Sequence, residues 1–196
     1  MNDKLQMGCS ASVEVIRAPK APQGDVVSPK GRYKVEHWRD GQLIGEYEAI
    51  NTTTNEGRAK LLNVMFHSGT PITAWYLGLA KDSTAFSASD TYAGGGAWNE
   101  LTTDYNESVR QAWTVVDSTP ANPAAISNTA SVATFTMLNA LTVTGLLLVG
   151  GGSAATTKGD KAGGGVLWSG AAFTGGSVAV LAADVLKVTY SVSAGA

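Results

Sequence analysis

The chain has 196 residues, and its 14 Lys and Arg against 16 Asp and Glu leave a formal net charge of −2. That length suits one domain with a sizeable core, alone or with an arm. The balanced charge gives no electrostatic footprint for nucleic acid or an anionic membrane, so we expect neither as a partner. The single cysteine, Cys9, excludes an intramolecular disulfide and a multi-cysteine metal site, and we expect no cofactor.

The N-terminal stretch, residues 1–30, predicts an extended arm. Prolines such as Pro19 and Pro22 each remove a backbone donor and disfavour a helix. Val13 and Val15 alternate with polar residues and can form a short strand. We therefore predict Val13, Val15, Pro19 and Pro22 as contacts with other subunits.

Residues 31–196 predict a single β-rich domain that opens with a β-hairpin over residues 33–50. Its two strands flank Asp40 and Gly41, which tolerate the positive φ of a type I′ turn. The alternation assigns opposite faces of the first strand to two sets of side chains, Tyr33, Val35 and His37 against Lys34, Glu36 and Trp38.

One helix is predicted, at about residues 55–67. Thr54 or Asn55 can cap it, and Gly69 and Pro71 end it. Its apolar side chains should pack on a sheet and enter the core. They are Leu61, Leu62, Met65 and Phe66.

The rest of the domain reads as short strands between Gly-rich, Asn-rich and Pro-rich turns. Residues 132–138 and 141–149 should pair about Asn139-Ala140, and residues 150–165 should form a loop. This pattern predicts a mainly β fold, an antiparallel β-sandwich for which the jelly roll is one candidate topology. The other predicted strands are 72–80, 98–101, 109–116, 166–169, 177–181 and 185–192.

No motif predicts an enzyme. His37 and His67 lack a His or Cys at zinc-ligand spacing, and no nucleophile-elbow pattern surrounds a serine. Paired carboxylates would serve glycoside hydrolysis or calcium binding, but solvated loop charges are the favoured interpretation. These acidic residues are Asp82, Asp90, Glu100, Asp104 and Glu107.

The five tryptophans are spread along the chain at strand positions, as expected of core or interface anchors. Among them we predict Trp38, Trp98 and Trp168 as interaction residues. Residues 118–196 carry only five charges, so either Ser and Thr cover this surface or other subunits do. The five are Lys158, Asp160, Lys161, Asp184 and Lys187.

Several segments follow one another in a distinctive order. They include Trp75-Tyr76-Leu77-Gly78-Leu79, Gly96-Ala97-Trp98-Asn99-Glu100, Arg110-Gln111-Ala112-Trp113 and Asp184-Val185-Leu186-Lys187-Val188-Thr189-Tyr190. In this order, residues 33–193 resemble a family of small structural proteins of tailed bacteriophages. The resemblance implies a virion component, made in the bacterial host cytoplasm, with no catalytic residues.

Three hypotheses follow. The first is a capsid decoration or cement protein that binds other copies of itself and the phage major capsid protein. The second is a tail, neck or fibre-anchoring protein that contacts a fibre or the host surface. The third is a glycan hydrolase that would use Glu100 or Asp104.

Overall fold

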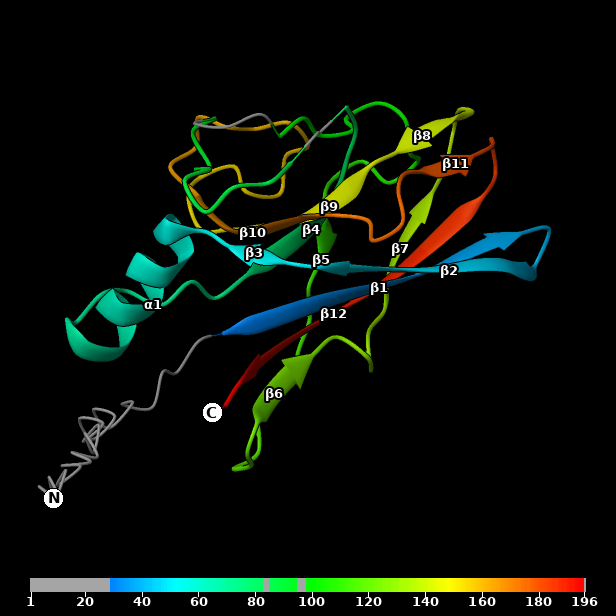
Figure 1. Ribbon diagram of the computed structural model, residues 1–196. Helices are drawn as coiled ribbons and strands as arrows, with labels where there is room; N and C mark the ends of the chain where they lie inside the picture. Colours follow the sequence, from blue (N-terminus) through cyan, green and yellow to red (C-terminus); the bar gives the residue numbers. More distant parts are fainter. Residues whose placement is uncertain (1–28, 83–84, 95–97, 196) are drawn as a thin grey trace, which may run out of the picture.

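The computed structural model describes residues 29–82, 85–94 and 98–195, which form a two-layer antiparallel β-sandwich with one helix (Figure 1). This confirms the predicted fold class. The predicted arm, apart from its last two residues, lies outside the described residues. The elements are β1 (Lys30–Arg39), β2 (Gln42–Ile50), β3 (Thr52–Thr53), α1 (Asn55–Phe66), β4 (Trp75–Ala80), β5 (Gln111–Ala112), β6 (Ala124–Ser127), β7 (Ala133–Thr136), β8 (Leu141–Val143), β9 (Gly145–Gly150), β10 (Val166–Ala172), β11 (Val178–Val180) and β12 (Val185–Ala194).

Two five-stranded sheets face each other. The first sheet has the order β2-β1-β12-β6, with β7 also paired to β12, and the second has the order β3-β10-β9-β4-β5. A separate two-stranded antiparallel sheet pairs β8 with β11. The main core lies between the two sheets and includes Val35, Leu77, Phe135, Leu146, Leu148 and Leu186.

The first sheet buries one face only, as its alternation predicts. Tyr33 and Val35 in β1 are fully buried, while Arg32 and Lys34, which alternate with them, are exposed. The turn to β2 has positive φ at Asp40 and Gly41, 50° and 75°, which confirms the predicted hairpin.

The second sheet is buried on both faces. Every residue of β9 is buried, which explains why Leu146–Val149 is an uninterrupted apolar run. Segments of little regular structure, within residues 85–94, 98–110 and 151–165, cover the outer face (Figure 1). They close a second apolar cluster made of Tyr92, Trp98, Leu147, Val149 and Leu167.

Strand pairing differs from the prediction for residues 132–149. β7 pairs with β12 in the first sheet, whereas β9 pairs with β4 and β10 in the second. The predicted pairing about Asn139-Ala140 is therefore wrong, because the chain crosses between the layers there. Residues 98–101 form only an isolated bridge, Glu100 opposite Ala80.

The helix forms where predicted, but its packing is not the one expected. Its only buried residue is Gly57, where an added Cβ would lie 3.0 Å from the carbonyl oxygen of Trp168. The helix thus meets β10 through bare backbone. Leu62, Met65 and Phe66 are 56%, 64% and 77% exposed, so the prediction that they enter the core is wrong.

The helix begins at a cap that the sequence identifies. The Thr54 hydroxyl accepts a hydrogen bond from the Gly57 N–H at 3.0 Å and donates one to the Leu167 carbonyl. We expect Thr54→Ala to lower the free energy of unfolding by about 1 kcal/mol, because it removes this cap. Urea denaturation measures the loss. Thr73→Ala, at an exposed position in the next segment, should leave stability unchanged, and an equal effect of both variants would contradict the cap's role.

A cluster of tyrosines joins the two sheets. The rings of Tyr33 and Tyr190 stack with centroids 4.1 Å apart. The Ser169 hydroxyl lies 2.8 Å from the Tyr33 hydroxyl and donates to the Tyr190 hydroxyl at 3.2 Å. The indole N–H of Trp168 also donates to the Tyr190 hydroxyl, at 3.1 Å. This bond holds the Trp168 side chain in place at one end of the core.

Candidate functional site

The predicted interaction residues lie in separate places. Val13, Val15, Pro19 and Pro22 fall outside the described residues. Of the predicted tryptophans, Trp98 is only 2% exposed, in the second apolar cluster. Its indole N–H donates to the Thr91 carbonyl at 3.1 Å, so this side chain offers a partner no surface in the present conformation.

The other two predicted tryptophans are half-buried. Trp38 lies on the outer face of the first sheet, where its N–H donates to Glu36 at 3.1 Å. The Lys187 ammonium sits 4.3 Å from its ring centroid. Trp168 lies at the end of the sandwich near α1. The structure does not bring Trp38, Trp98 and Trp168 together.

A buried ion pair holds the loops that cover the second sheet. Arg110 donates to both carboxylate oxygens of Glu100, from Nε at 2.8 Å and from Nη2 at 2.6 Å, with both side chains almost wholly enclosed. The guanidinium also donates to the carbonyls of Ala155 and Asp160, at 2.9 and 3.0 Å. The Gly159 N–H donates to Glu100 at 2.7 Å. These bonds occupy the pair completely, so its role is structural.

The electrostatics of this cluster follow from its burial. Burial, the largest single effect, acts to lower the pKa of Arg110, but the hydrogen bonds and charge of Glu100, together with the contribution of Tyr92, outweigh it and raise the pKa. The prediction of solvated loop charges is therefore wrong for Glu100. It is also wrong for Asp90, which is buried and accepts a bond from the Ser87 N–H at 2.9 Å.

His37 belongs to a second charged cluster, which lies near the turn between β1 and β2. Its Nε2 lies 2.7 Å from Asp184, which also accepts two bonds from Arg39, both at 2.7 Å. In the described part of the chain no Ser or Thr hydroxyl is hydrogen-bonded to His37, so a nucleophile-base pair is not assembled there. The cluster ties the start of β12 to the end of β1.

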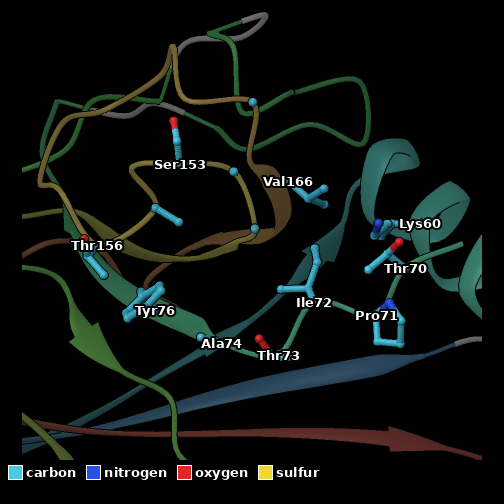
Figure 2. Close-up of a pocket in the computed structure, with 14 residues that line it drawn as sticks. Lys60, Thr70, Pro71, Ile72, Thr73, Ala74, Tyr76, Ser153, Thr156 and Val166 are labelled. Atoms are coloured by element: carbon cyan, nitrogen blue, oxygen red, sulfur yellow. The ribbon is translucent and has the colours of Figure 1, made fainter.

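A polar pocket of about 420 Å³ lies between the α1–β4 connection and the glycine-rich loop (Figure 2). Tyr76 lies at its base; Ser153 and Thr156 lie on one side, Lys60 and Thr70 on the other. Among the residues that the structure describes, no carboxylate and no histidine lines it. It therefore lacks the acid and base that glycoside hydrolysis requires, and Glu100 and Asp104 lie elsewhere.

An apolar groove of about 370 Å³ opens at the end of the sandwich next to α1, and among the described residues no charged side chain lines it. Its walls are built by Trp75 of β4, Trp113 after β5 and Trp168 of β10, together with Ile126 of β6. The rings of Trp75 and Trp168 meet edge to face, with centroids 6.1 Å apart. Sequence reasoning selected Trp168 but missed Trp75 and Trp113, because the three tryptophans come from segments that are distant in the sequence.

The helix extends this apolar surface. Leu61 lines the groove, and Met65 follows four residues later on the same side of the helix. Beside them, Leu62 and Phe66 are exposed. We call Leu62, Met65 and Phe66 the exposed helix face. Together, the groove and this face make one end of the domain apolar.

No protein-family model, no curated protein and no solved structure matches the chain. Within the described residues, no helix is long and apolar enough to cross a membrane. The same residues contain no group of three or more His, Cys, Asp or Glu side chains placed to hold a metal ion. The functional proposal therefore rests on the geometry and chemistry of the chain itself.

Proposed function

We propose that the protein is a non-enzymatic structural component of a bacteriophage virion, which decorates or cements the capsid by binding between subunits. The observation that carries this proposal is the apolar end of the domain. Three large side chains of the exposed helix face are more than half exposed, beside a groove walled by tryptophan. Monomeric proteins rarely leave so much contiguous apolar surface in water, whereas assembly interfaces use it.

The charges of residues 118–196 support the same proposal. Lys158 donates to the carbonyls of Tyr105 and Glu107, and Lys161 donates to the carbonyl of Trp98. Asp160 accepts a bond from the Tyr92 hydroxyl at 2.6 Å, and Asp184 is bound by Arg39. These few charges serve internal contacts, which leaves a surface rich in Ser, Thr and Ala that can pack against subunits at little desolvation cost.

The expected partners are other copies of the chain and the major capsid protein. The alternative is a tail, neck or fibre-anchoring protein, for which the polar pocket beside Tyr76 is the supporting observation. Hydroxyls around an aromatic ring suit a sugar or a polar loop of a fibre. A reconstruction of the phage particle that carries the protein separates these placements.

We expect the double variant Met65→Glu/Phe66→Glu to abolish binding to capsid shells that lack the protein. Two carboxylates on the exposed helix face would have to lose their hydration at the interface. The fold should persist, because neither side chain is packed in the core. Co-sedimentation with the shells measures binding, and circular dichroism measures folding.

The matched control is Asn63→Glu/His67→Glu, which adds the same two carboxylates at exposed positions near the end of the helix, away from its apolar face. It should bind like the unchanged chain. Retained binding by Met65→Glu/Phe66→Glu, or no binding by the unchanged chain, would contradict the proposed decoration role.

A further inference from the structure

The apolar groove lies where the arm leaves the domain. Pro29, the first described residue, lines the groove, so the arm joins the domain at the rim of the groove. β6 forms another part of the wall and is an edge strand of the first sheet, paired only to β12. The groove therefore combines an apolar wall with a strand edge that has no second neighbour among the described residues.

We propose that this groove binds residues 13–16 from the arm of a second copy of the chain. The proposal deepens the proposed assembly role and rests on it. The occupant is the segment Val13-Glu14-Val15-Ile16, with Val13 and Val15 directed at the tryptophans.

The chemistry of the two surfaces matches. In an extended segment Val13 and Val15 point to the same side, and Glu14 points to the other. Two valines fit a wall built from Trp113, Trp168 and other apolar side chains with no charge to desolvate. The segment's backbone can bond to the outer edge of β6, the mode by which extended peptides extend a sheet.

The arm is long enough to reach the groove of a second copy. From Ile16 to Pro29 the chain spans 13 residues, or about 43 Å when extended. β12, the full length of the first sheet, has 10 residues and spans about 33 Å. Pro19 and Pro22 in the connecting stretch favour extended backbone, which suits a reach away from the domain that carries the arm.

Cys9 is the only cysteine and lies four residues before Val13, so it provides a unique labelling position. We would attach a benzophenone photo-crosslinker to Cys9 of the full chain at natural isotope abundance. This chain is then mixed with ¹⁵N-enriched chain that carries no crosslinker. After illumination, mass spectrometry identifies the crosslinked peptides. Crosslinks of mixed isotope composition should concentrate on peptides that contain Trp113, Ile126 or Trp168.

Two variants and one control sharpen the test. Val13→Asp/Val15→Asp changes the arm alone and should raise the dissociation constant by about tenfold per valine, measured by sedimentation equilibrium. Ile126→Lys should weaken the same contact from the groove side. Ala18→Asp/Ala21→Asp adds the same charge to the arm outside the segment and should leave association unchanged.

Three results would overturn the inference. They are crosslinks found only within single chains, crosslinks scattered outside the groove, and association that Val13→Asp/Val15→Asp leaves intact. The crosslinking mixture contains no capsid, so it tests arm exchange between copies independently of capsid binding. Capsid binding without arm exchange would overturn this inference alone, and arm exchange without capsid binding would overturn the decoration role alone.

Discussion

Replacing Glu100 with alanine is expected to lower the free energy of unfolding by about 3–5 kcal/mol, the cost of leaving a buried charge without its partner. The Arg110 side chain has no exposed surface, so its guanidinium cannot recover hydration when the carboxylate is lost. The Gly159 N–H loses its acceptor as well. Urea denaturation followed by tryptophan fluorescence measures the change.

Two further variants test the cause of this loss. Glu46→Ala removes a half-exposed ion pair with Lys34, and its cost should stay below about 1 kcal/mol. The double variant Glu100→Leu/Arg110→Met removes both buried charges and should cost less than the two single changes added together. If Glu100→Ala costs no more than Glu46→Ala, the ion pair does not secure the loops.

The second large effect is expected at Asp184. Asp184→Asn should lower the free energy of unfolding by about 2–3 kcal/mol near neutral pH, because the amide replaces charge-assisted hydrogen bonds to Arg39 and His37. Asp117→Asn, at an exposed position, is the control and should change little.

The pH dependence of this variant has a definite sign. Hydrogen bonds from Arg39, with further bonds from Leu181 and His37, hold the pKa of Asp184 well below its usual range, although burial opposes them. In the unfolded chain the carboxyl titrates near a pKa of about 3.9. The stabilisation is therefore fully present above about pH 4 and is lost as the pH falls through the lower folded pKa. The difference in the free energy of unfolding between the unchanged chain and Asp184→Asn should therefore become smaller between pH 4 and pH 3. A difference that stays constant over this range would contradict the proposed role of the Asp184 charge.

Features that depend on neighbouring residues were predictable from the sequence. The turn at Asp40-Gly41 needs two residues that tolerate positive φ, and the sequence places them between two alternating strands. Thr54 marks the helix start, because a hydroxyl before an apolar helical pattern is a cap signal.

Features that depend on distant segments were not predictable. Leu62 and Phe66 have the spacing of a buried helix face, but α1 meets β10 through Gly57 instead. The available signal was Gly57 inside the helical pattern. A glycine there costs about 1 kcal/mol of helix stability relative to alanine, and it often marks a close approach of another backbone. The pairing of β7 with β12 carries no local signal at all.

The candidate site shows the same division. Glu100 and Arg110 are ten residues apart in segments without regular structure, so only the folded chain shows that they pair. The groove likewise draws Trp75, Trp113 and Trp168 from three segments. The sequence predicts that tryptophans anchor the core or an interface, but it contains no indication of which ones meet.

The position of β1 has a mechanical consequence. The arm continues directly from β1, and β1 is an inner strand, paired along its length to β12 on one side and to β2 on the other. Tension that reaches Pro29 along the strand axis runs perpendicular to these hydrogen bonds and loads both ladders at the same time. An arm attached to an edge strand such as β6 would load one ladder only. A tether that starts at β1 therefore passes force into two ladders of the first sheet instead of one.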